Sequence, residues 1–156
     1  KDIIYAGVDV GAGYDVPYGY IINEVNNFFQ EEQILNAYYH EYMHYIEAIF
    51  PDRFDNETWN SFNPGDFNYS FGGALEMISL NSTFVNKDHP SPGFLNGYCT
   101  ADIYQDKAEV FSYLFVPSLY KKSSPWPEYD TYLKGKFDYM KNVLQSMSAD
   151  FNFKLN

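Results

Sequence analysis

The chain of 156 residues has little of three things that often reveal a function: cysteine, positive charge and long apolar runs. Cys99 is its only cysteine, so the chain can form neither an internal disulfide nor a cysteine-based zinc site. Ten Lys and Arg residues stand against 21 Asp and Glu, and the net charge of −11 removes the main electrostatic attraction to phosphate. No apolar run reaches the ~20 residues of a transmembrane helix. We therefore expect neither a nucleic-acid partner nor a membrane span.

Aromatic residues are abundant instead. They make up 21% of the chain, with 16 Tyr and 14 Phe, and apolar residues together reach 46%. A chain of this length and composition can bury most of its surface around one core, which argues against disorder. We expect a single domain over residues 1–156 and a monomer. The chain begins at Lys1 without Met and has no signal-like segment, so we expect a processed or trimmed form from which any export signal is gone.

Periodicity predicts an α+β fold in which helix predominates. Residues 2–11 and 18–25 are β-branched and apolar, which indicates a strand and then either a second strand or the approach to a helix. Over residues 31–50 apolar side chains recur every three or four positions, which predicts a helix that stops at Pro51. The segment 51–73 is rich in Asn, Asp, Gly and Pro, and we predict a long loop there.

The second half of the chain is predicted to be mainly helical. Residues 72–85 fit a helix or a strand equally well, and residues 87–98 have the composition of turns. A helix is predicted over 104–120, which Pro117 either bends or ends early. A last amphipathic helix is predicted over 129–148.

Two of the three histidines lie on the first predicted helix, in the stretch YYHEYMHYIE at 38–47. His40 and His44 are four residues apart, so both imidazoles project from one helix face and can reach one metal ion. Glu41 projects beside them, where its carboxylate can take a proton from a water that zinc has acidified to a pKa of about 7. This is the H-E-x-x-H arrangement of zinc metalloproteases, and it predicts Zn2+ as the cofactor.

The residues around the pair favour a metal site over the alternative, two core histidines hydrogen-bonded to tyrosines. Small Ala37 and Ala48 share the histidine face and leave room for a metal ion and a substrate. The opposite face carries larger apolar side chains that we predict to face the core. These are Leu35, Tyr38, Tyr42, Ile46 and Ile49.

A catalytic zinc site needs a third protein ligand in addition to an open water position. His89, the remaining histidine, lies in a Pro-flanked loop, so a carboxylate from a second helix is the natural candidate. The predicted helix IYQDKAEVFSYLF (103–115) carries Asp106 and Glu109 one turn apart. The alternative for such a pair is a solvated acidic face, which the apolar residues of the same helix disfavour.

An H-E-x-x-H helix with a distant carboxylate helix resembles the gluzincin metallopeptidases. The wider pattern is similar to the lethal-factor-like and Pro-Pro-endopeptidase branch and to zinc-binding metallopeptidases of bacterial surfaces. Their second helix reads E-x-x-A-E followed by an aromatic residue, with a Gly-Phe…Tyr stretch before it. GFLNGYCTADIYQDKAEVF matches this pattern, and a W…N…Y pattern after the histidine helix is also similar. The matching residues are Gly93, Phe94, Tyr98, Asp106, Ala108, Glu109 and Phe111, with Trp59, Asn63 and Tyr69.

The resemblance implies a zincin-like single domain, mostly helical, with an active-site HExxH helix, a second carboxylate helix and a small β-sheet. It implies a zinc-dependent endopeptidase that acts on a peptide or protein substrate, outside the cell or at its surface. Glu41 corresponds to the general base. Tyr98 matches the tyrosine that hydrogen-bonds the oxyanion forming on the attacked carbonyl.

The chain departs from this pattern at Gln105, where the family has its zinc-binding Glu. Glu109 matches the last Glu of the pattern, which in the family orients a ligand histidine. Zinc favours a charged carboxylate over a neutral amide, so we predict Glu109 as the third ligand, with Asp106 and then Gln105 as alternatives. The same departure supports a second hypothesis, a zincin-like domain that has lost catalysis and binds peptide or glycan in its cleft.

Overall fold

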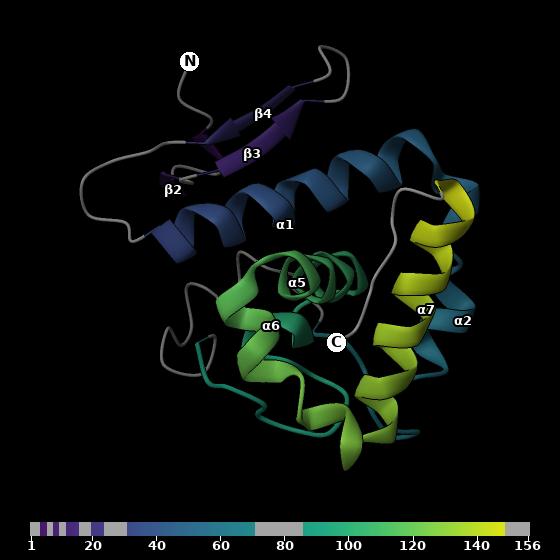
Figure 1. Cartoon of the computed structure of the whole chain (residues 1–156). Helices are drawn as coiled ribbons and strands as arrows, with labels where there is room; N and C mark the ends of the chain where they lie inside the picture. The colour runs from purple at the N-terminus through teal and green to yellow at the C-terminus, as the bar shows by residue number, and fades with distance from the viewer. Residues whose placement is uncertain are drawn as a thin grey trace.

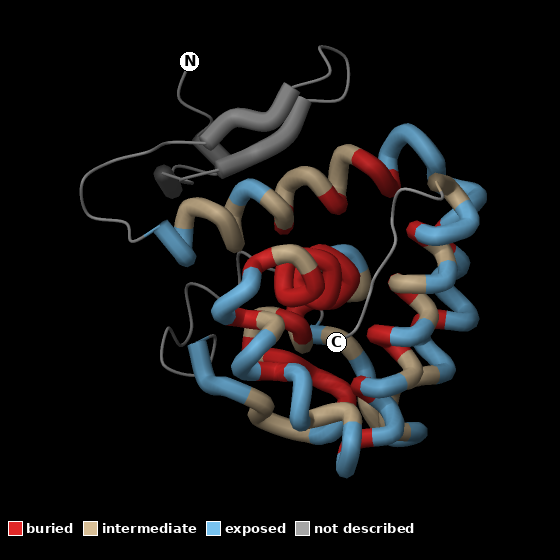
Figure 2. The backbone as a smooth tube through the Cα atoms, in the orientation of Figure 1, coloured by how far each residue is buried: buried red, intermediate tan, exposed pale blue. Residues whose placement is uncertain are grey.

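One buried helix, α5 (Ile103–Phe115), lies at the centre of the described part of the chain (Figure 1). The structure is a computed structural model that describes residues 31–70 and 86–148, together with the backbone of four short strands within residues 4–23. Figure 2 shows α5 as a nearly continuous buried stretch surrounded by other elements. A helix enclosed in this way normally has apolar side chains on every face.

Charged side chains make α5 unusual for a buried helix. Asp106, Lys107 and Glu109 are 0%, 0% and 4% exposed, although nothing but hydrogen bonding and ion pairing can offset the cost of removing such groups from water. Their partners come from other elements, as the site below shows. Buried charge as well as apolar packing therefore connects this helix to the elements around it.

The helices around α5 come from both sides of it in the sequence. They are α1 (Glu31–Ile49), α2 (Asn56–Asn60), α6 (Pro117–Ser123) and α7 (Thr131–Met147). Short 3-10 helices occupy Pro51–Arg53, Gly97–Thr100 and Trp126–Glu128. Helix accounts for 69% of the described residues, so the prediction of a mostly helical protein is confirmed.

Antiparallel strand pairs occupy part of the N-terminal region. β1 (Ile4–Tyr5) pairs with β2 (Val8–Asp9), and β3 (Ala12–Asp15) pairs with β4 (Tyr20–Asn23). The β3–β4 hairpin contacts α1 on the side of that helix away from α5 (Figure 1). The zincin-like arrangement of a sheet and helices that the resemblance implies stays a prediction.

The helix boundaries agree with the proline positions. The helix predicted over 104–120 is divided, because α5 ends at Phe115 and Pro117 begins α6. Proline cannot donate the backbone hydrogen bond that would continue a helix, but its fixed φ suits a first turn. Of the two predicted effects of Pro117, a bend or an early end, the structure has the early end.

The prediction of a long loop over 51–73 is wrong in part. Within it, α2 begins after Asp55, whose side chain accepts hydrogen bonds from the backbone N–H groups of Glu57 and Thr58. An Asp at this position satisfies donors that the first helical turn leaves free. The helix places Trp59, which is fully buried, against the core. Loop composition concealed a short helix because that helix depends on its cap and its packing.

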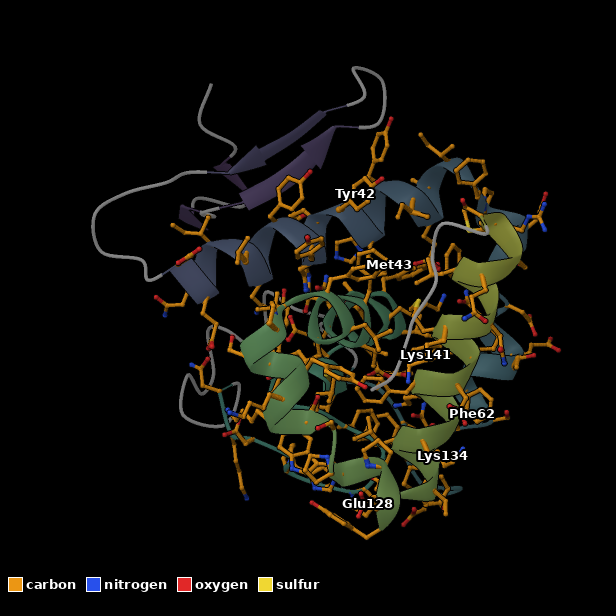
Figure 3. The ribbon with its side chains drawn as sticks, in the orientation of Figure 1. Tyr42, Met43, Phe62, Glu128, Lys134 and Lys141 are labelled. Atoms are coloured by element: carbon orange, nitrogen blue, oxygen red, sulfur yellow. The ribbon has the colours of Figure 1, made fainter. Side chains whose placement is uncertain are left out.

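The predicted orientation of α1 is wrong in part, because Leu35, Tyr42 and Ile46 pack on the core as predicted but the histidine face is buried as well. The histidine face packs against α5: His40 is 7% exposed, and Met43 is fully buried on the side of α1 that faces α5 (Figure 3). Tyr38 and Ile49, predicted to face the core, are 42% and 41% exposed, although Ile46 is buried as predicted. Polar side chains on α5 give His40 its partners, since Glu109 and Gln105 lie at hydrogen-bonding distance from its two ring nitrogens.

The apolar core fills the space between α5, α7 and the segment around residues 94–99. Its fully buried large side chains include Trp59, Phe94, Leu95, Leu133, Met140 and Leu144. Among the helices that the structure describes, none is both long and apolar enough to cross a membrane. Residues 72–85, predicted as a helix or a strand, lie outside the described residues.

Candidate functional site

Three possible metal-donor atoms, two from α1 and one from α5, lie close together. Nε2 of His44 lies 3.1 Å from Nε2 of His40, and Oε1 of Gln105 lies 2.8 Å from the same His40 atom. The helix α1 supplies both imidazoles because positions four apart lie one turn apart on one face. The first turn of α5 supplies Gln105, and Asp102 fixes that turn by accepting hydrogen bonds from the N–H groups of Tyr104 and Gln105.

Glu109 lies on the other side of the His40 ring. Its Oε1 accepts from His40 Nδ1 at 2.8 Å, and its Oε2 accepts from Asn96 Nδ2 at 2.6 Å. A carboxylate on one ring nitrogen orients the other nitrogen toward a metal and increases its basicity. This placement differs from the prediction that Glu109 is the third ligand, because its carboxylate faces Nδ1 rather than the two Nε2 atoms.

Asp106, the first alternative for the third ligand, belongs to a buried network. Its Oδ2 accepts hydrogen bonds from Trp59 Nε1 at 2.9 Å, Tyr69 OH at 2.8 Å and Lys136 Nζ at 2.7 Å. The Asn63 amide in turn donates to Tyr69 OH at 3.1 Å. All three residues of the W…N…Y pattern therefore support this buried carboxylate. Asp106 holds α2 and α7 against α5 and does not take the position predicted for a metal ligand.

Lys107 is a buried cation next to the histidine helix. Its side chain is 0% exposed, and its Nζ donates to Glu47 of α1 and to Asn56 of α2. Glu47 lies one turn beyond His44, so the ion pair attaches α1 to α5 close to the histidines. A buried lysine without such a partner would be strongly unfavourable, and the pairing therefore fixes how the two helices meet.

Burial and nearby charge decide the protonation of the histidine pair. Burial lowers the pKa of His44 to about 3, aided by the positive charge of His40 and opposed by a hydrogen bond to Gln105. Burial also acts to lower the pKa of His40, but the hydrogen bond and negative charge of Glu109 outweigh it, and the pKa is raised. His44 is therefore neutral near pH 7, the form in which imidazole binds metals.

Glu41 and Tyr98 lie near the pair with perturbed acidity. Burial raises the pKa of the Glu41 carboxyl, against the opposing effect of His40. The Tyr98 ring lies 5.7 Å from the His40 ring, centroid to centroid. Burial, followed by the negative charges of Glu109 and Glu41, raises the pKa of the Tyr98 phenol, which stays protonated and able to donate. Both residues are thus in the surroundings of the histidine pair, and the catalytic roles predicted for them stay predictions.

The converging donors suit a divalent metal with nitrogen and oxygen ligands. Two donors at ~2.0–2.1 Å from a tetrahedral zinc are about 3.3 Å apart, and the observed separations of 3.1 Å and 2.8 Å need only small adjustments. Among the residues that the structure describes, no group of three or more His, Cys, Asp or Glu could hold a metal ion. The third donor atom beside the two imidazoles is the amide oxygen of Gln105.

The third histidine is engaged elsewhere. Nε2 of His89 lies 3.0 Å from Oδ2 of Asp130, which also accepts from Gly93 N at 2.6 Å. The His89 ring packs on Trp126, with centroids 5.1 Å apart. His89 thus supports the start of α7, in agreement with its exclusion as a candidate ligand.

No protein-family model, curated protein or solved structure matches this chain. The residues that sequence reasoning missed at this site are Asn96, Lys107 and Glu47. Asn96 precedes Gly97, a pair typical of turns, which could have pointed to a capping role. Nothing in the sequence distinguishes a buried Lys107–Glu47 pair from two solvated side chains.

Proposed function

We propose that this chain is a zinc-dependent endopeptidase in which His40, His44 and Gln105 hold the metal. The observation that carries the proposal is the convergence of two imidazole Nε2 atoms and one amide oxygen, with a buried carboxylate on Nδ1 of His40. The H-E-x-x-H spacing on α1 supports it. Because the Gln105 amide is neutral, this site has one negative charge fewer than a site with two histidines and a glutamate.

The side chains divide the work of peptide hydrolysis among them. His40, His44 and Gln105 would hold the zinc ion, which would act as a Lewis acid and lower the pKa of a bound water to about 7. Glu41 takes the proton of the attacking water and delivers it to the leaving amine, for which its raised pKa is suited. Tyr98 donates a hydrogen bond to the oxygen on which negative charge develops. Glu109 holds His40 in the orientation and tautomer that leave Nε2 free for the metal.

One observation favours a second candidate, a zincin-like domain that binds peptide or glycan without catalysis. Gln105 Oε1 can accept a hydrogen bond from a protonated His40 Nε2, 2.8 Å away, so the same side chains form a closed hydrogen-bonded cluster when that nitrogen carries a proton. To bind here, a metal ion must displace the proton on His40 Nε2, and the third ligand available to it, the Gln105 amide, carries no charge. The two candidates therefore differ in whether zinc competes successfully for Nε2.

Metal content and cleavage of a peptide pool separate these candidates. The protein is purified without chelator, its zinc is measured by mass spectrometry, and the wild type is compared with Glu41→Gln. The matched control is Glu32→Gln, the same change at an exposed position of the same helix. We expect one zinc per chain in all forms and a loss of roughly 10²- to 10⁴-fold in cleavage for Glu41→Gln alone. Absence of zinc and of cleavage in the wild type would rule out the endopeptidase.

A further inference from the structure

The Asn96 side chain joins the two halves of the candidate site. Its Nδ2 donates to Glu109 Oε2 at 2.6 Å, and the other oxygen of that carboxylate accepts from His40 Nδ1 at 2.8 Å. Its Oδ1 accepts from the backbone N–H of Cys99 at 3.1 Å. That second bond caps the turn Gly97–Thr100, which carries Tyr98. One amide thus contacts the group that orients a metal ligand and the turn that positions a phenol donor.

The backbone holds Asn96 in place from both sides. Asp88 forms a β-bridge with Asn96, Gly97 N donates to Lys87 O at 3.2 Å, and His89 N donates to Leu95 O at 2.8 Å. The Leu95 side chain before it is fully buried. Because the main chain is fixed on each side, the Asn96 side chain has little freedom to change partners. Its hydrogen bonds to Glu109 and to the Cys99 N–H therefore link that carboxylate and the turn rigidly.

We infer that Asn96 is a positioning residue that sets His40 and Tyr98 relative to each other through Glu109 and the turn Gly97–Thr100. The inference deepens the proposed function and rests on it, because it takes His40 as a metal ligand and Tyr98 as the hydrogen-bond donor to the oxyanion. A displaced carboxylate would turn the His40 ring and weaken metal binding. A displaced turn would move the phenol away from the developing oxyanion, which slows turnover more than it weakens substrate binding.

Asn96→Asp separates this role from simple capping. Asp caps as well as Asn does, so the bond to Cys99 N–H is kept, but the donor to Glu109 is replaced by a second carboxylate. We expect Zn2+ affinity, measured by competition with a chromophoric chelator, to fall roughly 10- to 100-fold. We also expect kcat to fall with little change in KM. Alkylation of the buried Cys99 thiol should stay as slow as in the wild type, which shows that the turn is intact.

The double variant Asn96→Asp/Glu109→Gln reverses the polarity of the linkage without changing net charge. The introduced amide at position 109 can donate to the introduced carboxylate, while its oxygen still accepts from His40 Nδ1. We expect the double variant to recover most of the zinc affinity that Asn96→Asp loses, and to exceed Glu109→Gln alone. Wild-type affinity in Asn96→Asp, or a double variant no better than the weaker single variant, would overturn the inference.

A metal-free measurement distinguishes failure of this inference from failure of the proposed function. If the wild type binds zinc but cleaves no peptide, the endopeptidase is ruled out and the affinity series still tests Asn96. If the wild type binds no zinc, the imidazole nitrogen NMR shifts of His40 report its bond to Glu109 directly. A shift that changes in Asn96→Asp and returns in the double variant supports the positioning role. An unchanged shift in Asn96→Asp overturns it.

Discussion

Gln105 sets the charge of the candidate centre. Its amide oxygen lies 2.8 Å from His40 Nε2, in the place where the resemblance leads one to expect a carboxylate. Among the described residues, the carboxylates that act on His40 electrostatically are Glu109, behind its ring, and Glu41. Neither replaces a charged ligand, since attraction to a metal falls with distance and with the surrounding dielectric. We therefore expect the neutral amide of Gln105, in place of a charged carboxylate, to limit the metal affinity of this site.

Gln105→Glu should tighten zinc binding at least about tenfold, because a carboxylate adds a direct charge interaction with the metal. Competition with a chromophoric chelator at fixed pH measures the change. The control is Gln145→Glu, which adds the same charge at an exposed position of α7 and should leave affinity unchanged. Equal affinities for Gln105→Glu and the wild type would show that Gln105 does not face the metal.

At the scale of elements, α7 shows how packing can reverse an intrinsic preference. Gly135 lies inside this helix, where Ala is normally favoured by about 1 kcal/mol. A Cβ at Gly135 would overlap the ring of Phe62, whose Cγ would lie 3.0 Å away. Figure 3 shows Phe62 beside α7. The glycine permits close approach of an aromatic ring from the segment after α2.

Gly135→Ala should destabilise the protein by about 1–3 kcal/mol, because the ring must shift within a packed site. Urea denaturation gives the free energy of unfolding. In a Phe62→Ala background the obstacle is absent, so the same Gly135→Ala change should become neutral or stabilising by up to about 1 kcal/mol. A change of the same size and sign in both backgrounds would mean that the ring is not the cause.

At the scale of the whole molecule, buried ion pairs tie separate elements to α5. Asp106 and Lys136 are both 0% exposed, and Lys136 also donates to the backbone oxygen of Gly93 at 2.7 Å. Its Nζ lies 3.8 Å from the centre of the Phe94 ring. Such a pair adds little over an apolar pair, but the removal of one partner leaves a buried charge without compensation.

Lys136→Met should therefore cost about 3–5 kcal/mol of unfolding free energy. Lys134→Met is the matched control two residues earlier. Its pair with Asp138 is exposed, with side chains 58% and 50% accessible, and its loss should cost less than about 0.5 kcal/mol. Urea denaturation of both variants makes the comparison. Similar costs for the two changes would contradict the assignment of Lys136 to a buried network.

Much of the local structure could be predicted from the sequence because it depends on neighbours along the chain. The period of apolar residues and Pro51 defined α1, and Pro117 ended α5. The placement of His40 and His44 on one face followed from helical geometry. The short helix α2 could not be predicted in the same way, since its cap at Asp55 resembles any polar loop residue.

The sequence by itself determined the long helices α1, α5 and α7, the prolines after α1 and α5, and the histidine pair with Glu41, because each depends on spacing within one segment. Only the tertiary structure decided which face of α1 is buried and which side chain of α5 meets His40 on which nitrogen. Those outcomes depend on how two helices distant in sequence rotate against each other. That rotation is fixed by buried partners such as Lys107 with Glu47 and Glu109 with Asn96, whose pairing no local pattern encodes.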